Sequence, residues 1–410
     1  MAILVGASRL IAACLVLGVA CFTAINGVEA QQNHPFGARR SLLGGAIFDI
    51  TKFEAKADGT TDNAMPIIRA WNAACRSPGA AKVVIPRGNF MAGEIVLAGP
   101  CSAQMTLEIQ GTLLANPDPS TYTGGSWIML QKVDNVVVTG GGTINGQGKN
   151  YWQYAGGDSP LPVSLVFQTV GNAKLYNLKF VDSMGFHSKV TDSHDVSVQQ
   201  LRINAPADSP NTDGIHLSSS KNVNITDSVI GTGDDCISIG HGVVNLAIAR
   251  ITCGPGHGIS IGSLGKRVDE TNLKGVRITN CTLIATTNGA RIKTYHDSPQ
   301  ITASDIVFQD IKMIDVKHPI IIDQHYNSKT KPGESKVKIS NARFVNIKGS
   351  STSPVAVTLN CSSAAPCEGI QLENIDLVPS RSMGPLTSAC SHAKFLFKGI
   401  QNPKALANCV

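Results

Sequence analysis

A short β-strand pattern recurs along most of this chain. Each copy begins with a turn-forming or polar residue, followed by an apolar residue, any residue and a second apolar residue. The copies begin at Asn135, Asn172, Asp195, Asn222, Asn245, Gly275, Asp305, Lys336 and Gly369, at steps of 23 to 37 residues without helical segments between them. This spacing is typical of a solenoid whose repeats stack around a continuous core, and it fits neither leucine-rich repeats nor propeller blades. We therefore predict an all-β fold, a single-domain right-handed parallel β-helix.

The two ends of the chain carry patterns of their own. Residues 1–30 have the features of a secretory signal peptide, with Arg9 before an apolar run and a small-residue end. Residues 31–45 are polar and are expected to form a flexible leader. Apolar side chains recur at helical spacing in residues 67–75, which predicts a short helix that covers the open end of the solenoid. Residues 46–410 are then expected to form the β-helix domain, with a C-terminal cap over about 381–410.

Composition agrees with an extracellular protein. The chain is 42% hydrophobic and 16% charged, which suits a soluble β-rich protein. Its net charge of +6 is either ordinary solubility charge or an attraction to a polyanion of the cell wall or matrix. A basic stripe interleaved with aromatic residues is missing, and no segment after the signal is long and apolar enough to span a membrane. We expect a secreted monomer with neither nucleic-acid nor membrane partners.

Nine of the 11 cysteines remain once the signal peptide is removed. In an oxidising compartment most of them should form disulfide bonds. The pairs closest in sequence are Cys75 with Cys101, Cys236 with Cys253, Cys361 with Cys367 and Cys390 with Cys409, which leaves Cys281 unpaired. Glycosylation sequons at Asn224, Asn280 and Asn360 also agree with secretion, although each is a weak signal.

Three polar segments align on their apolar tails. Asp213 precedes Gly-Ile-His-Leu, Asp235 precedes Cys-Ile-Ser-Ile and His257 precedes Gly-Ile-Ser-Ile, at two equal steps of 22 residues. If each segment occupies one coil, adjacent members lie roughly 4.8 Å apart. Two carboxylates and an imidazole would then form one cluster. Asp234, next to Asp235, would belong to the cluster but point in a different direction.

This alignment conflicts with strict strand alternation. Alternation would turn Asp213 toward the core together with Ile215, so the backbone must bend between them. Gly214 and Gly258 permit such a bend because they lack a side chain, whereas Cys236 at the equivalent position has no special freedom.

A cluster of three aspartates suits acid–base chemistry. Like charges a few Å apart raise the pKa of at least one carboxyl, and an inverting glycosidase needs one protonated acid and one ionised base. We expect Asp213 and Asp235 to share and deprotonate a water molecule, and Asp234 to act as the acid. Stacking alone does not distinguish Asp234 from Asp235 in role. His257, between two glycines, should be accessible and should hold the acid's proton or orient the substrate.

Two cations follow the aspartates. Arg291 and Lys293 flank Ile292, so both side chains point to the same face of their strand. They predict a ligand that bears carboxylate or phosphate, because arginine pairs well with such groups. The alternative is that they balance the charge of the aspartates. Tyr326 is a further candidate for lining a sugar subsite, or else an aromatic residue at a strand end.

Four ordered motifs identify a family resemblance. Asn211-Thr-Asp, Gly233-Asp-Asp, Gly256-His-Gly and Arg291-Ile-Lys resemble those of the polygalacturonases, the family 28 glycoside hydrolases. The resemblance runs from about Phe48 to the C-terminus, and details around residues 254–265 are similar to the plant enzymes of the pollen group, which are often exo-acting. It implies hydrolysis of α-1,4-galacturonosyl links in pectate with inversion, without a metal or other cofactor.

The resemblance also implies residue roles. Asp234 would be the general acid, Asp213 and Asp235 the base pair and His257 a supporting catalytic group. The substrate-binding residues would be Arg291, Lys293, Tyr326 and Asn211. One departure is Glu54, where the family usually has glycine, and it concerns only local N-terminal packing.

Other interpretations remain open at this stage. A calcium-dependent pectate lyase shares the β-helix, and clustered aspartates could bind Ca²⁺. A non-catalytic wall-binding or tailspike-like module would not need all three aspartates, which are present. Endo against exo action depends on whether loops close one end of the groove, which the sequence does not show.

Overall fold

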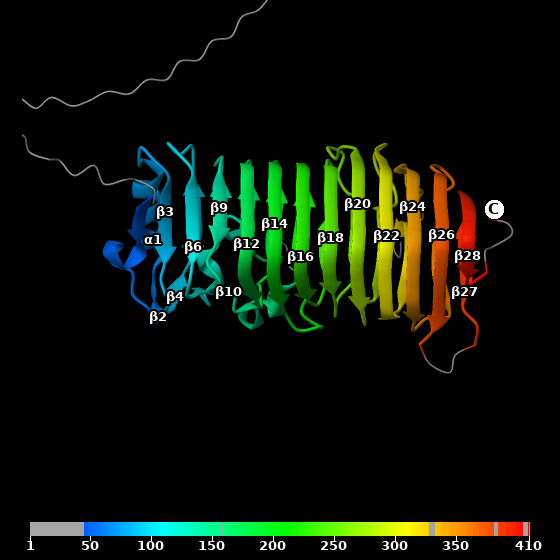
Figure 1. The fold of residues 1–410 in the computed structure, drawn as a ribbon, viewed down its shortest axis with the longest axis horizontal. Helices are drawn as coiled ribbons and strands as arrows, with labels where there is room; N and C mark the ends of the chain where they lie inside the picture. The colour runs from blue at the N-terminus through cyan, green and yellow to red at the C-terminus, as the bar shows by residue number, and fades with distance from the viewer. Residues whose placement is uncertain (1–44, 157–159, 328–332, 381–383, 405–408, 410) are drawn as a thin grey trace, which may run out of the picture. The chain divides into compact units, whose positions relative to one another are not determined.

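The computed structural model describes residues 45–410, apart from 157–159, 328–332, 381–383, 405–408 and 410 (Figure 1). Its strands form two parallel sheets, and successive coils of the chain add one strand after another to each sheet. The parallel β-helix predicted from the repeat is thereby confirmed.

The first sheet holds 17 of the described strands and includes the long ones that carry the repeat. They are β1 (Ala46–Asp49), β2 (Asp58–Asp62), β3 (Ala81–Ile85), β4 (Asn89–Ala92), β6 (Met105–Ile109), β7 (Thr112–Ala115), β9 (Val136–Thr139), β10 (Thr143–Asn145), β12 (Gly171–Val181), β14 (His194–Asn204), β16 (Lys221–Gly231), β18 (Val244–Cys253), β20 (Leu273–Ile284), β22 (Thr302–Val316), β24 (Lys338–Ser351), β26 (Cys367–Pro379) and β28 (Ala393–Asn402).

The second sheet holds 11 of the described strands, mostly shorter. They are β5 (Ile95–Ala98), β8 (Ser126–Gln131), β11 (Val163–Gln168), β13 (Ser188–Thr191), β15 (Ile215–Ser218), β17 (Ile237–Ile239), β19 (Ile259–Leu264), β21 (Asn288–Tyr295), β23 (His318–Tyr326), β25 (Val355–Asn360) and β27 (Thr387–Ser391). Four short 3-10 helices lie in the connections: η1 (Ile50–Phe53), η2 (Pro119–Thr121), η3 (Gly148–Asn150) and η4 (Trp152–Tyr154).

The residue that opens each repeat adopts a left-handed backbone conformation. Asn135, Asn172 and Asn222 have φ angles of 57°, 49° and 55°. Asn, Asp and Gly tolerate this region better than other residues, which explains why they begin the repeat. Their side chains also stack from coil to coil, as in the 2.6 Å hydrogen bond from Asn172 Nδ2 to Asn135 Oδ1.

The copy of the repeat predicted to begin at Lys336 begins at Asn341 instead. In the register of β22 and β24, Ser304 lies opposite Ser340 and Ile306 opposite Ala342, so Asp305 faces Asn341 and not Lys336. Asn341 has a φ of 52° and donates to Asp305 Oδ1 at 3.2 Å. The pattern Val-Lys-Ile after Lys336 imitates the repeat, but only the left-handed position reveals the true register.

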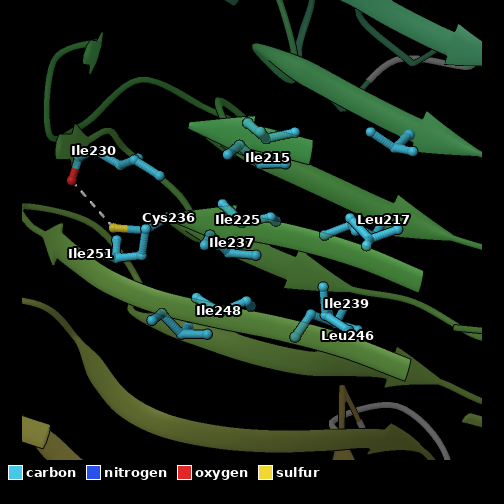
Figure 2. Close-up of a cluster of buried hydrophobic side chains, with 14 of the residues drawn as sticks. Ile215, Leu217, Ile225, Ile230, Cys236, Ile237, Ile239, Leu246, Ile248 and Ile251 are labelled. Atoms are coloured by element: carbon cyan, nitrogen blue, oxygen red, sulfur yellow. Dashed lines mark hydrogen bonds between the residues drawn. The ribbon is translucent and has the colours of Figure 1, made fainter. Parts of the chain in front are cut away.

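Aliphatic side chains from both sheets fill the interior (Figure 2). Ile215 and Leu217 on β15 and Ile237 on β17 point inward and meet Ile225 and Ile248 from the first sheet. All five are at most 1% exposed. Burial of one such side chain stabilises the fold by about 1.5–3 kcal/mol, so each coil contributes its own share of stability.

The predicted helix is present as α1 (Ala64–Cys75), the one α-helix in the described part of the chain. Its inner face carries Ile67, Ala70, Trp71 and Ala74, all at most 1% exposed. The helix packs against β1, β3 and β5, and Trp71 Nε1 donates to the carbonyl oxygen of Ala98 at 3.0 Å. It therefore covers the apolar interior at the first coils, as expected.

The four expected disulfide bonds are confirmed. They join Cys75 with Cys101, Cys236 with Cys253, Cys361 with Cys367 and Cys390 with Cys409. Cys281 is the remaining cysteine of the described chain, and it is free and buried.

The structure describes most of the C-terminal segment of the chain but not the first 44 residues. The expected signal peptide and nearly all of the expected leader lie outside the described residues. The segment expected to act as a C-terminal cap adds β27 to the second sheet and β28 to the first, and so continues the solenoid by a further coil. No helix in the described residues is long and apolar enough to cross a membrane.

Glu54 adopts a left-handed backbone conformation, which explains why similar proteins usually have glycine at this position. It ends η1 with a φ of 75°, and its carboxylate forms an exposed 3.0 Å ion pair with Arg69. Both Glu54→Gly and Glu54→Ala remove this ion pair, but only glycine removes the left-handed strain. We expect Glu54→Gly to be more stable than Glu54→Ala by about 1 kcal/mol in denaturant unfolding. Equal stabilities would show that the strain is absent in solution.

Candidate active site

The strand register places the aligned polar residues in one row. Ile215 lies opposite Ile237, and Ile237 opposite Ile259. The residues two positions earlier, Asp213, Asp235 and His257, therefore occupy equivalent places on three successive coils. The equal steps of 22 residues indicated this arrangement correctly.

The bend required before these strands is also present. Cys236 and Ile237 are both fully buried, so two consecutive side chains point inward and strand alternation shifts by one residue. Asp235 can then point outward. The bend does not depend on a permissive residue at position 236, because the Cys236 side chain occupies the core and bonds to Cys253. At Gly214 a Cβ atom would come within 2.5 Å of the Cys236 carbonyl oxygen, so glycine is needed there for close approach.

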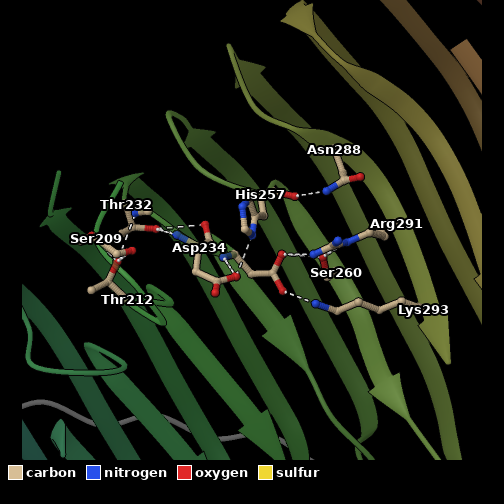
Figure 3. Close-up of polar contacts among 11 residues, drawn as sticks. Ser209, Thr212, Thr232, Asp234, His257, Ser260, Asn288, Arg291 and Lys293 are labelled. Carbon is tan, nitrogen blue, oxygen red and sulfur yellow. Dashed lines mark hydrogen bonds and ion pairs between the residues drawn. The ribbon is translucent and has the colours of Figure 1, made fainter. Parts of the chain in front are cut away.

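Asp235 is held by two cations and a hydroxyl group (Figure 3). Its Oδ1 accepts from Ser260 Oγ and from Arg291 Nη2, both at 2.7 Å, and its Oδ2 accepts from Lys293 Nζ at 2.9 Å. Arg291 Nε also donates to Ser260 Oγ at 2.8 Å. The Asp235 side chain is only 1% exposed. This charged cluster is buried but fully paired, which is the condition for burying ions without a large penalty.

The pKa values of the two stacked aspartates move in opposite directions. Burial, and then the charges of Asp234 and Asp235, raise the pKa of Asp213 well above its ordinary value. Burial alone would also raise the pKa of Asp235, but the charges of Arg291 and Lys293 outweigh it and lower that pKa. Asp235 is therefore the ionised member of the pair, and Asp213 is the member that holds a proton more readily.

Asp234 points away from this cluster and pairs with His257. Asp234 Oδ1 lies 2.9 Å from His257 Nδ1 and also accepts from the backbone N–H of Asp235 at 2.8 Å. The His257 side chain is 40% exposed and that of Asp234 is 20% exposed. Both are open to a ligand while Asp235 beneath them is closed, so the neighbouring aspartates have the different orientations that were expected.

Tyr326 lies next to the cations. The Lys293 ammonium is 5.1 Å from the centroid of the Tyr326 ring, and Tyr326 packs edge to face with Tyr295 at 5.6 Å. Asn211 is exposed at the turn before Asp213 and has a φ of 52°. The structure thus brings Tyr326 to the cluster and places Asn211 at its border.

Sequence reasoning missed several residues of this site. Ser260 joins Asp235 to Arg291, and Asn288, on the coil after His257, donates to the carbonyl oxygen of His257 at 3.3 Å. Ser238 hydrogen-bonds the Asp213 carboxyl. Serine and asparagine are common in turns and strands, and only Ser238 and Ser260 could have been found, because they occupy one position of the aligned segments.

The cluster is better suited to proton transfer than to a cation. Asp234, Asp235 and His257 present ligand atoms within 4.8 Å of one another. Calcium, however, prefers six to eight oxygen ligands, and both oxygens of Asp235 already pair with fixed cations.

Residues 75–400 match the model of the glycosyl hydrolases of family 28. The chain belongs to this family. A polygalacturonase of Gossypium barbadense is 44% identical over 365 residues, which cover 87% of this chain and 89% of the relative. An exopolygalacturonase of Zea mays is 40% identical over 391 residues, which cover 93% and 95%.

The fold of this family 28 chain is also that of solved structures. An exopolygalacturonase from Thermotoga maritima superposes with a TM-score of 0.74 at 18% identity, over 86% of this chain and 90% of that chain. At this identity the likeness concerns the fold alone. Family membership confirms the resemblance found in the four motifs, and it makes the chain a glycoside hydrolase.

Proposed function

We propose that this family 28 enzyme hydrolyses α-1,4-galacturonosyl bonds of polygalacturonate from a chain end, in the plant cell wall. The observation that carries the proposal is the pairing of an exposed Asp234–His257 couple with a buried Asp235 between two cations. The plant relatives named polygalacturonase and exopolygalacturonase support the substrate and the exo mode. The signal-peptide pattern and four disulfides support secretion.

Asp234 serves as the general acid in this proposal. It is the most exposed of the three carboxyl groups, so it can reach the glycosidic oxygen of a bound chain. Its proton passes to that oxygen as the bond to the anomeric carbon breaks. His257 is a supporting group, because its Nδ1 lies within hydrogen-bond distance of Asp234 and can stabilise the carboxylate that forms.

Asp235 and Asp213 form the base pair. A carboxylate has about four acceptor positions, and Asp235 uses two on Oδ1 and one on Oδ2. One position on Oδ2 remains for a water molecule. That water attacks the anomeric carbon and gives its proton to Asp235, while Asp213 on the preceding coil holds the water's other side.

The spacing of the carboxyl groups makes stereochemistry an informative test. Ligand atoms of Asp234 and Asp235 lie within 4.8 Å, closer than the roughly 6.5–9.5 Å usual for inverting enzymes. A retaining mechanism would need Asp235 as nucleophile, however, and two cations and Ser260 hold its oxygens in a buried position. We therefore retain inversion as the proposal.

The expected products test both the exo mode and inversion. From the start of digestion of polygalacturonate, monomeric galacturonic acid should be the only product, and its first-formed anomer should be β in proton NMR. Mixed oligomers would indicate endo action, and an α anomer would indicate retention. Fully methyl-esterified pectin should be a poorer substrate, because its units carry no charge for Arg291 and Lys293 to bind.

The calcium-dependent lyase remains the competing activity to test. Lyase action leaves an unsaturated product that absorbs ultraviolet light and stops when Ca²⁺ is removed. We expect no such absorbance and unchanged activity in excess chelator. Loss of activity in chelator, restored by Ca²⁺, would contradict the proposed hydrolysis.

A further inference from the structure

A groove of about 370 Å³ lies on the outer side of the second sheet. Three cations line it: Lys189 on β13, and Lys266 and Arg267 in the loop after β19. Through the strand register, Lys189 and His216 begin a row of outward positions that continues over two coils to Arg291. The groove therefore continues the outer surface of the active site toward the N-terminal coils.

Two of the three acidic residues that line this groove are engaged within their own loop. Asp269 pairs with Arg267 at 3.0 Å. The Glu270 carboxylate accepts from the backbone N–H groups of Gly265, Lys266 and Arg267, at 2.6, 3.1 and 3.1 Å. These bonds give the loop a defined shape and occupy both oxygens of the Glu270 carboxylate.

Lys189 has one acidic neighbour at the groove, Asp192, whose charge raises its pKa without an ion pair forming between them. Lys189 is half-buried, and among the described residues it forms neither an ion pair nor a side-chain hydrogen bond. Burial, and then the charge of Arg267, lower the pKa of Lys189. Lys266 also has no carboxylate partner there and contacts only the ring of Tyr295, at 5.9 Å. Two such ammonium groups facing one groove are arranged for an anion supplied from outside the chain.

The same groove offers a surface for a sugar ring. His216 packs against Phe186 with a centroid distance of 5.1 Å, and its Nδ1 lies 2.8 Å from Ser238 Oγ. Burial and the charge of Lys189 lower the pKa of His216 to about 3, so the imidazole is neutral. A neutral aromatic pair beside unpaired cations matches a ring that carries a carboxylate better than it matches a bare anion.

We propose that Lys189, Lys266 and Arg267 bind the carboxylate of a second uronate unit of the polymer. This inference rests on the proposed function. Lys189 and Arg291 are four coils apart, roughly 19 Å at the spacing of paired strands, so one sugar cannot contact both. The groove therefore binds a unit beyond those on either side of the cleaved bond.

Lys189→Met tests this subsite, because methionine keeps the apolar stem and removes the charge. We expect KM for polygalacturonate to rise about tenfold or more, with kcat within about twofold of the wild type. On digalacturonate, which fills only the two sites around the cleaved bond, the variant should equal the wild type. Its Tm should change little, because the removed ammonium forms no ion pair with its acidic neighbour Asp192.

The matched control is Lys312→Met, at an exposed outward position of β22 on the first sheet. It should change neither KM nor Tm, which excludes a general effect of net charge. The proposal is wrong if Lys189→Met leaves KM for the polymer unchanged, raises it equally on digalacturonate, or lowers Tm and kcat together.

Binding provides a readout that does not need catalysis. In an Asp234→Asn background, calorimetry should show that Lys189→Met weakens binding of a long oligogalacturonate about tenfold, and equal affinities would overturn the subsite. If the wild type does not hydrolyse polygalacturonate at all, the proposed function fails, and this measurement still decides whether the groove binds uronates.

Discussion

Each of the variants Asp213→Asn, Asp234→Asn and Asp235→Asn should lose activity on polygalacturonate by on the order of 10²–10⁴-fold. Asn is nearly isosteric with Asp but neither donates nor accepts a proton in the required step. The measurement is kcat at several pH values. Asp227→Asn is the control, because Asp227 is an exposed aspartate of β16 paired with Arg250, outside the site. Any of the three variants that keeps more than about a tenth of wild-type kcat would remove that residue from the mechanism.

Stability should separate these three variants. Asp235→Asn leaves Arg291 and Lys293 buried without their counter-charge, which costs about 3–5 kcal/mol. Asp213→Asn replaces a carboxyl whose pKa is raised, so it should be as stable as the wild type at neutral pH, or more stable. Asp234→Asn changes a partly exposed group and should have a small effect. A wild-type unfolding free energy for Asp235→Asn would contradict the role of the cation pair.

The second large effect is expected from Arg291. Arg291→Met removes one of the two cations that keep the pKa of Asp235 below its ordinary value, so that pKa should rise. The acid limb of kcat/KM should then move to higher pH. Because substrate binding and base ionisation both suffer, kcat/KM should fall by about 10²-fold or more. Arg291→Lys keeps the charge but loses the planar guanidinium group that contacts both Asp235 and Ser260. Its kcat/KM should lie between those of the wild type and Arg291→Met.

The stability of the Arg291→Met variant should follow the same logic. A carboxyl whose pKa is lowered by folding stabilises the fold at any pH above its pKa in the unfolded chain. This contribution is lost as the pH falls through its pKa in the folded protein. Because the folded pKa of Asp235 should be higher in Arg291→Met, this contribution should be smaller and its loss complete at a higher pH than in the wild type. The control is Arg250→Met, which breaks an exposed bidentate pair with Asp227 and should cost at most about 1 kcal/mol without changing the pH profile. An unshifted acid limb in Arg291→Met would show that Asp235 does not depend on this cation.

These results distinguish two roles for Arg291 and Lys293 that the sequence left open. Without ligand, both pair with Asp235, which is the charge-balancing role. To bind substrate, Arg291 and Lys293 must use their remaining N–H donors to contact a galacturonate carboxylate. Alternatively, the Lys293 ammonium must move over the Tyr326 ring to contact it. An effect confined to KM would favour binding, and a shift of the pH profile would favour control of Asp235.

The sequence by itself determined the coil structure and the row of aligned polar residues. Backbone preferences at the left-handed positions and apolar alternation are local properties, so the repeat, α1 and the row of Asp213, Asp235 and His257 could be predicted from neighbouring residues. The copy of the repeat predicted at Lys336 is wrong, because its apolar pattern matches the repeat but its first residue is not at a left-handed turn position. Asn341, five residues later, meets the left-handed requirement.

Only the tertiary structure decided what the charges do. Whether Asp235 is ionised depends on Ser260, Arg291 and Lys293, which lie 25 to 58 residues away in sequence and reach it from later coils. Electrostatic energies depend on separation and burial, and neither can be read from spacing along the chain. For the same reason the groove around Lys189 could not be recognised, because the absence of an ion-pair partner depends on everything packed around that lysine.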